Sequence, residues 1–181
     1  MECIALVGRA GSGKSTIGKI LAEKLGFTYI STGDIARAMN DKNLAHGRMA
    51  NEDDMRYMFR HMINECAING SCKFIIDGMP RTEEQVDFLR EVFEEVNFIE
   101  IDTAEDIAIE RLLTRSRSDD SRQNIKARQD TYNQTISCIK NKILDYYLNG
   151  GVKTYKYYMN DDNANIEGLT DQILVYIKTR I

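Results

Sequence analysis

The sequence predicts an α/β fold of three layers, in which a parallel sheet of five strands is covered by helices on both faces. Three observations lead to this prediction. Short apolar runs alternate with segments of helical periodicity along the chain. The runs are continuously apolar, as expected of parallel strands that are covered on both faces. A glycine-rich stretch joins the first apolar run to the first helical segment.

Apolar spacing and helix-terminating residues define the elements of the first half of the chain. Gly26 ends the first helical segment, and Asn51 can cap the third. Either Ser31 or Thr32 can cap the second. The sequence therefore predicts strands at residues 3–7, 27–30 and 74–77, helices at residues 16–25, 35–39 and 51–66, and a polar, mobile loop at residues 40–51.

The second half of the chain continues the alternation. Thr82 and Gln85 are spaced as in a capping box, which begins a helix that runs to residue 93. A long helix that begins near Asp119 ends at Gly150 and Gly151. Further strands are predicted at residues 97–101 and 154–158, and further helices at residues 105–115, 119–148 and 166–178.

Length, composition and charge restrict the class of protein. The chain has 181 residues, of which 43% are hydrophobic, so it can bury about 70% of its unfolded surface as one domain. Its formal net charge of −4 argues against general electrostatic binding to nucleic acid. No apolar run approaches the roughly 20 residues that a membrane-spanning helix needs.

The cysteines and the start of the chain indicate a cytoplasmic protein. The chain opens directly into its first strand, which leaves no room for a signal peptide. Its four cysteines lack C-x-x-C spacing and are interpreted as reduced thiols, and neither histidine is spaced to form a metal site with them. Because no apolar surface stripe is evident, we expect a monomer without membrane contact.

Residues 8–15 fit the pattern G-x-x-x-x-G-K-[ST], between a strand and a helix, which predicts a phosphate-binding loop. Gly8, Gly11 and Gly13 permit positive φ angles and a close approach of backbone N–H groups to an anion. Lys14 adds a full charge for the outer phosphates of a nucleotide, and Ser15 offers a hydroxyl to Mg²⁺. The alternative is a glycine-rich turn without a ligand, which the flanking strand and helix disfavour.

Two further polar clusters follow the ends of predicted strands, at residues 31–34 and 77–81. Because the carboxyl ends of parallel strands lie at one edge of a sheet, we expect both clusters to lie beside the glycine-rich loop. Asp77 can hold Mg²⁺ directly or through water. Pro80 fixes the backbone before Arg81, whose planar guanidinium suits a phosphate group.

Four arginines lie in or around the short turn at residues 116–119: Arg111, Arg115, Arg117 and Arg128. The first two are four residues apart and therefore share a helix face. Asp119 and Asp120 can hold two of the guanidiniums in a fixed geometry. We interpret the group as a clamp for a phosphoryl group in transfer, and the alternative is a solvated, charged helix face.

The chain resembles the adenylate kinase-like nucleoside monophosphate kinases over nearly its whole length. The matching motifs are residues 8–16, residues 31–35 with Arg37, residues 77–81 with Gln85, and residues 115–120 with Arg128. The resemblance implies a P-loop fold with strand order 2-3-1-4-5 and one kinase domain at residues 1–181. Within it, residues 31–60 would bind the acceptor nucleotide and residues 115–120 would form a short lid.

The resemblance also implies the activity and the roles of individual residues. ATP, bound with Mg²⁺, would give its γ-phosphoryl group to a nucleoside monophosphate, with AMP favoured and UMP, CMP or a deoxynucleotide as alternatives. The residues implied for ATP are Gly8, Ala10, Gly11, Ser12, Gly13, Lys14, Ser15, Thr16, Arg111 and Arg115, with Arg111 stacked on the adenine. Those implied for the acceptor are Thr32, Gly33, Arg37, Ala50, Gly78, Arg81, Gln85, Arg117 and Arg128, with backbone near Gly47. The catalytic set implied is Lys14, Arg81, Arg115, Arg117 and Arg128, and the metal ligands are Ser15 and Asp77.

Two other functions remain open from the sequence. One is a phosphotransferase for another small metabolite, such as a sugar acid, although Thr32, Arg37 and Gln85 suit a nucleotide acceptor better. The other is a non-catalytic nucleotide-binding regulator, which the short lid alone favours. The resemblance finally implies a cis peptide bond before Pro80.

Overall fold

A computed structural model describes residues 1–39, 49–115, 117, 120–161 and 165–181. Five parallel strands form one sheet in the order β2-β3-β1-β4-β5. From one edge to the other, these strands are β2 (Thr28–Ser31), β3 (Lys73–Asp77), β1 (Glu2–Val7), β4 (Glu95–Asp102) and β5 (Thr154–Met159). The predicted fold class and strand order are confirmed.

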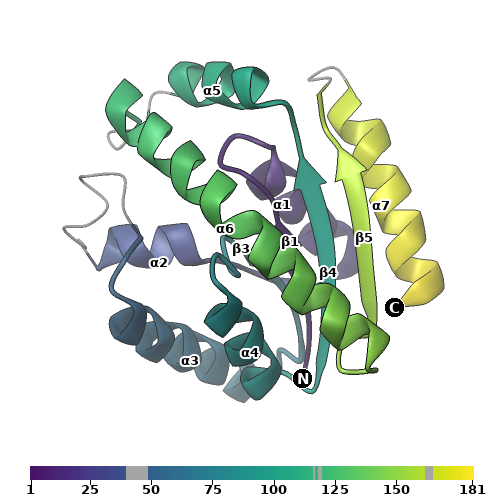
Figure 1. The fold of residues 1–181 in the computed structure, drawn as a ribbon. Helices are drawn as coiled ribbons and strands as arrows, with labels where there is room; N and C mark the ends of the chain where they lie inside the picture. The colour runs from purple at the N-terminus through teal and green to yellow at the C-terminus, as the bar shows by residue number, and fades with distance from the viewer. Residues whose placement is uncertain (40–48, 116, 118–119, 162–164) are drawn as a thin grey trace.

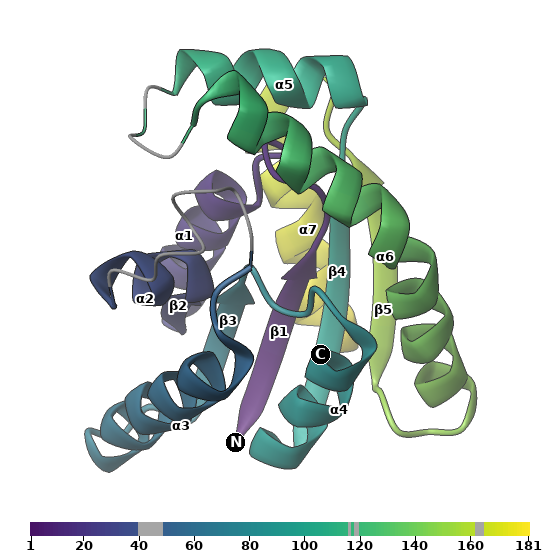
Figure 2. The same cartoon turned by 60° about the vertical axis from the view of Figure 1, so that its left-hand side comes forward.

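Helices cover both faces of the sheet, as Figure 1 shows. One face is covered by α2 (Thr32–Ala38), α3 (Glu52–Ile68), α4 (Glu83–Val92) and α6 (Arg122–Leu148), and the other by α1 (Lys14–Leu25) and α7 (Ile166–Arg180). The remaining helix, α5 (Glu105–Thr114), lies beyond the carboxyl end of the sheet, above α6 in Figure 2. These are the three layers that the sequence predicts.

The central strand β1 shows why its sequence is apolar without alternation. Cys3, Ala5 and Val7 pack in the hydrophobic cluster that faces α3, α4 and α6. Ile4 and Leu6 pack in the cluster that faces α1 and α7. Burial of a Val, Leu or Ile side chain contributes about 1.5–3 kcal/mol. Both clusters therefore fix β1, and with it the glycine-rich loop that follows its last residue.

Three helix caps follow the sequence, with one difference in detail. Asn51 caps α3 through its side chain, and Ser31, rather than Thr32, caps α2. Thr82 caps α4 by accepting a hydrogen bond from the N–H of Gln85. In a full capping box, the Gln85 side chain would accept from the N–H of Thr82. Its oxygen accepts instead from the backbone N–H of Arg81. The predicted capping box is therefore only half formed.

The ends of the elements differ from the predicted ends by at most three residues. For example, β2 begins at Thr28 because the N–H of Phe27 still donates to Ala22 in α1. The predicted loop at residues 40–51 and the predicted lid at residues 115–120 are described only in part. Residues 40–48, which include Gly47, and residues 116, 118 and 119 lie outside the described residues.

The remaining expectations about the chain concern its thiols, its proline and the membrane. The four cysteines are free, as predicted, with Cys3 buried and Cys72 and Cys138 exposed. The Met79–Pro80 peptide bond is cis, as the resemblance implies. Among the described residues, no helix is both long and apolar enough to cross a membrane.

Candidate active site

The carboxyl end of the sheet carries a cavity of about 490 Å³. The predicted site residues that line it are Gly8, Ala10, Gly11, Gly13, Lys14, Ser15, Thr16, Gly33, Arg37, Asp77, Gly78, Arg81, Arg111, Arg115, Arg117 and Arg128. A side pocket of about 70 Å³ shares Gly33, Arg37, Gly78, Arg81 and Arg128 with this cavity and adds Thr32, Ala50 and Gln85. Ser12, within the glycine-rich loop, is fully buried. The structure therefore brings together the residues that the sequence predicts for one site.

The glycine-rich loop, residues 8–15, adopts the backbone that its glycines were expected to permit. Gly8, Gly11 and Gly13 have φ angles of 143°, 91° and 91°. A Cβ atom on Gly8 would lie 1.9 Å from the carbonyl oxygen of Ile101, and one on Gly11 would lie 2.5 Å from that of Ala108. Because L-residues rarely adopt such φ angles and a side chain would clash, only glycine fits these positions.

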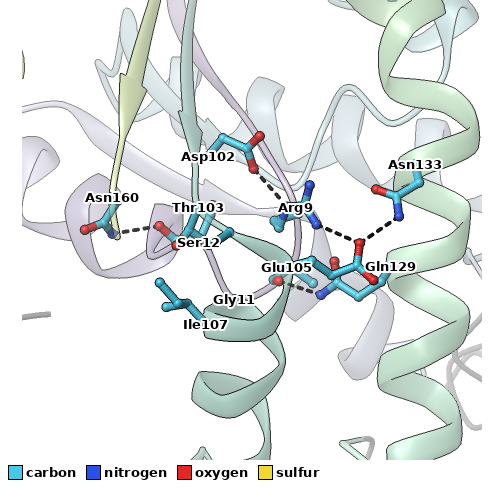
Figure 3. Close-up of polar contacts among 12 residues, drawn as sticks. Arg9, Gly11, Ser12, Asp102, Thr103, Glu105, Ile107, Gln129, Asn133 and Asn160 are labelled. Atoms are coloured by element: carbon cyan, nitrogen blue, oxygen red, sulfur yellow. Dashed lines mark hydrogen bonds and ion pairs between the residues drawn. The ribbon is translucent and has the colours of Figure 1, made fainter. Parts of the chain in front are cut away.

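The carbonyl groups of this loop are bonded away from an anion site. The Nζ of Lys14 donates to the carbonyl of Arg9 at 2.6 Å, and the Nε2 of Gln129 donates to that of Ala10 at 2.9 Å. The Nδ2 of Asn160 donates to the carbonyl of Ser12 at 2.8 Å (Figure 3). These donors hold three carbonyls of the loop in place, and the N–H of Ser12 also donates to the carbonyl of Arg9 at 3.2 Å.

The side chain of Arg9 attaches the same loop to three neighbouring elements. Its Nε donates to Oδ1 of Asp102 at 3.0 Å, and its Nη1 donates to Oε2 of Glu105 at 3.2 Å (Figure 3). Its guanidinium carbon lies 4.9 Å from the centre of the Tyr132 ring. The Nδ2 of Asn133 donates to the same oxygen of Glu105 at 2.8 Å. The loop is therefore braced against β4, α5 and α6.

Asp77 lies at the carboxyl end of β3 and faces the loop. Its Oδ2 accepts hydrogen bonds from the Ser15 hydroxyl at 2.5 Å and from the Tyr29 hydroxyl at 2.7 Å. Burial, and then the charge of Asp77, raise the pKa of the Tyr29 hydroxyl, which keeps it a donor. A carboxylate and a hydroxyl beside a phosphate site are the oxygen donors that suit Mg²⁺.

Arg115, Arg128 and Asp120 form a unit that we call the arginine clamp. Nε and Nη2 of Arg115 donate to the two carboxylate oxygens of Asp120 at 2.9 and 3.0 Å, and Nη2 of Arg128 donates to Oδ1 at 2.7 Å. The Asp120 side chain is only 2% exposed. Burial alone would raise its pKa, but the two guanidiniums outweigh burial and hold the pKa below its usual value. One carboxylate therefore holds two cations beside the cavity.

Two further guanidiniums lie at the border between the cavity and the side pocket. Nε of Arg81 donates to the carbonyl of Gly78 at 2.8 Å, in the turn around Pro80. Arg37 forms an ion pair with Asp34, one turn away in α2. The cavity thus concentrates positive charge from several elements, which suits a ligand with several phosphate groups.

Comparison with known proteins places this geometry in a family. A family model described as an AAA domain matches residues 7–126. An adenylate kinase of Corynebacterium urealyticum is 32% identical over 160 residues, which cover 80% of this chain and 84% of the relative. An adenylate kinase of Nocardia farcinica is 34% identical over 161 residues, with the same two coverages. The chain belongs to the adenylate kinase-like nucleoside monophosphate kinases. The glycine-rich loop of this kinase is therefore its P-loop.

A solved structure extends the likeness of fold to the whole kinase. The unliganded structure of a sugar kinase from a Janibacter species has a TM-score of 0.69 and covers 98% of this chain. This chain in turn covers 95% of that protein, at 15% sequence identity. At such an identity the likeness concerns the arrangement of strands and helices alone.

The P-loop lysine of this kinase has an altered pKa. Burial lowers the pKa of Lys14 to about 8, because the attraction of Asp77 compensates burial only in part and the charge of Arg81 adds to the lowering. A bound polyphosphate would favour the charged form of the ammonium group. The binding of a nucleotide and of a proton at Lys14 are therefore linked.

We expect the binding of ATP to this kinase to weaken as the pH rises above the pKa of Lys14. At about pH 9 the free protein carries mostly neutral Lys14, so binding must take up a proton, and affinity can fall up to tenfold per pH unit. Calorimetric titration with ATP in EDTA, in two buffers of different ionisation enthalpy, measures this uptake. Lys14→Met should abolish it, and an equal heat in both buffers for the unaltered protein would contradict the prediction.

Arg111, which the resemblance implies to stack on adenine, lies between the P-loop and the end of β5. Its Nη1 donates to the carbonyl of Asn160 at 2.8 Å and to the Thr103 hydroxyl at 3.4 Å. It also lines the cavity. Its stacking on a base stays a prediction.

The sequence reasoning missed the residues that hold the P-loop in place. Arg9 occupies an unspecified position of the motif, and Gln129 and Asn160 belong to no motif. Of these three residues, only Asn160 could have been predicted from its position in the sequence. It directly follows β5 and so lies at the same sheet edge as the predicted clusters. Gln129 follows the predicted Arg128 but faces a different part of the site.

Proposed function

We propose that this kinase transfers the γ-phosphoryl group of Mg²⁺-bound ATP to AMP and releases two molecules of ADP. One observation carries the proposal: the P-loop and six arginines surround one cavity, which shares lining residues with a side pocket. The arginines are Arg37, Arg81, Arg111, Arg115, Arg117 and Arg128. ATP would bind at the P-loop, and AMP would bind with its base in the side pocket. The phosphates of the two nucleotides would then meet between the arginines. Such positioning supplies much of the catalysis in phosphoryl transfer.

On the donor side, the P-loop N–H groups and Lys14 would bind the phosphates of ATP. Ser15 and Asp77 would hold Mg²⁺, which would neutralise charge on the phosphates. Among the described residues, no group of three or more His, Cys, Asp or Glu side chains could hold a metal ion alone. This is consistent with a cation that is bound by one carboxylate together with substrate phosphates.

On the acceptor side, Arg37 and Arg81 would bind the phosphate of AMP, and Thr32 and Gln85 would contact its base. Arg115, Arg117 and Arg128 would surround the phosphoryl group in transfer. The transition state is metaphosphate-like and spreads negative charge over the equatorial oxygens. Fixed guanidiniums stabilise that charge without reorganisation, so the proposal requires no general base.

The test is the production of ADP from ATP, Mg²⁺ and each of AMP, dAMP, CMP, UMP and GMP. We expect transfer to AMP to have the highest kcat/KM. Faster transfer to CMP or UMP would assign a pyrimidine acceptor instead. Binding of ATP with no transfer to any acceptor would contradict the proposed activity and favour a regulatory role.

A further inference from the structure

We propose that Glu52 determines which bases this kinase accepts, by fixing the orientation of the Gln85 amide. The fixed amide would select a base that carries an amino group beside an unprotonated ring nitrogen, as adenine and cytosine do. Bases with a keto group beside a ring N–H would be rejected. This inference rests on the proposed function and concerns the side pocket alone.

The amide of Gln85 is held at both of its ends. The residue lies in the first turn of α4 and is 5% exposed. Its Oε1 accepts a hydrogen bond from the backbone N–H of Arg81 at 2.7 Å, and its Nε2 donates to Oε2 of Glu52 at 2.7 Å. Glu52 begins α3, and its other oxygen accepts from Nε of Arg56 at 2.9 Å. Both Glu52 and Gln85 line the side pocket.

These two partners permit one orientation of the amide. A backbone N–H can only donate, and a carboxylate that is ion-paired with Arg56 can only accept. If the amide were reversed, its NH₂ group would face the N–H of Arg81, and its oxygen would face the carboxylate of Glu52. Two hydrogen bonds would be lost, one of them charge-assisted, and two repulsive contacts would replace them. The chemistry of the neighbours therefore assigns the amide without ambiguity.

The fixed amide offers a defined pattern to a ligand. A primary amide has two N–H donors and two acceptor lone pairs, and Gln85 has used one of each. The remaining donor and acceptor match the ring nitrogen and the amino group of adenine or cytosine. Hypoxanthine, guanine and uracil present the reverse pattern at the same ring position. Because Arg37 and Arg81 would anchor the phosphate, the ring could not shift to restore the match.

The decisive pair of substrates is AMP and IMP, whose bases differ at this edge. For the unaltered kinase we expect kcat/KM to be about 100-fold higher with AMP than with IMP, because a buried polar group would be left mismatched. CMP should likewise be preferred to UMP. In Glu52→Gln, the neutral amide can donate as well as accept, so a reversed Gln85 would lose its bond to the N–H of Arg81 but could keep one to position 52. Because one of the two constraints on the amide is removed, the AMP-to-IMP ratio should then fall about tenfold, with the KM for ATP unchanged.

Asp53→Asn provides the matched control, because Asp53 is the exposed carboxylate next to Glu52 in the same helical turn. It should keep the AMP-to-IMP ratio of the unaltered kinase. A Glu52→Gln variant that melts normally and keeps the full ratio would overturn the inference and leave the proposed function intact. Equal use of AMP and IMP, or of CMP and UMP, by the unaltered kinase would also overturn it and needs no substitution. A failure to phosphorylate any monophosphate would contradict the proposed function instead.

Discussion

Replacement of Lys14 with methionine should lower the rate of ATP-dependent phosphoryl transfer by at least about a thousandfold. Methionine has a similar length but no charge, so the P-loop would lose the ammonium group that we propose for the outer phosphates of ATP. In the structure this group is held within 2.6 Å of the Arg9 carbonyl and 3.3 Å of the Ser12 hydroxyl. It is therefore positioned before a nucleotide arrives, and solvent cannot replace it in the same place.

The loss should appear in single-turnover measurements with saturating ATP, because the lysine would stabilise charge that develops during transfer. Lys24→Met is the matched control, since Lys24 lies on the same helix and forms an exposed ion pair with Asp171. Such a pair contributes about 0–1 kcal/mol to stability. A Lys14→Met variant with an unaltered rate and an unaltered affinity for ATP would contradict the assignment of the P-loop.

Asp120→Asn should lower kcat by about 100-fold, because it releases both guanidiniums of the arginine clamp. The carboxylate accepts three hydrogen bonds from Arg115 and Arg128. Asparagine has the same shape but no charge, and its NH₂ group would face the donors of an arginine. The two arginines would then repel each other beside the cavity, although Nε of Arg128 would still donate to the carbonyl of Asn124.

The effect of Asp120→Asn should fall on kcat more than on the KM for ATP, because the clamp would act on the phosphoryl group in transfer. Asp130→Asn, an exposed carboxylate on α6, serves as the control and should leave both constants unchanged. The melting temperatures of both variants show whether a lower kcat comes from a displaced arginine clamp or from a less stable fold. A folded Asp120→Asn variant with the kcat of the unaltered kinase would show that the clamp has no part in transfer.

The arrangement of the site follows from short-range signals in the sequence. The P-loop, Asp77 and Arg81 each come directly after a predicted strand, and parallel strands end at one edge of the sheet. The sequence also predicts that Asp119 and Asp120 hold two of the four arginines, and the structure shows that Asp120 holds Arg115 and Arg128. Local spacing and the chain-connection rules are sufficient for these features.

The contacts that orient the P-loop and the Gln85 amide could not be predicted from local sequence patterns. Gln129 reaches Ala10 across 119 positions of the chain, Asn160 reaches Ser12 across 148, and Glu52 reaches Gln85 across 33. When two residues are so far apart in the sequence, no local pattern predicts that their side chains will form a hydrogen bond. The ends of the elements were also inexact, because sheet pairing and helix capping, rather than propensity, decide the last residue.

Arg128 and Gln129 occupy consecutive positions of α6, a continuous helix of 27 residues. The first bonds to Asp120 and the second to the carbonyl of Ala10. Because both contacts come from neighbouring residues of one helix, a displacement of α6 at this point would alter the contact to Asp120 and the support of the P-loop together. We therefore expect a substitution that shifts this turn of α6 to weaken binding at the P-loop and the arginine clamp at the same time.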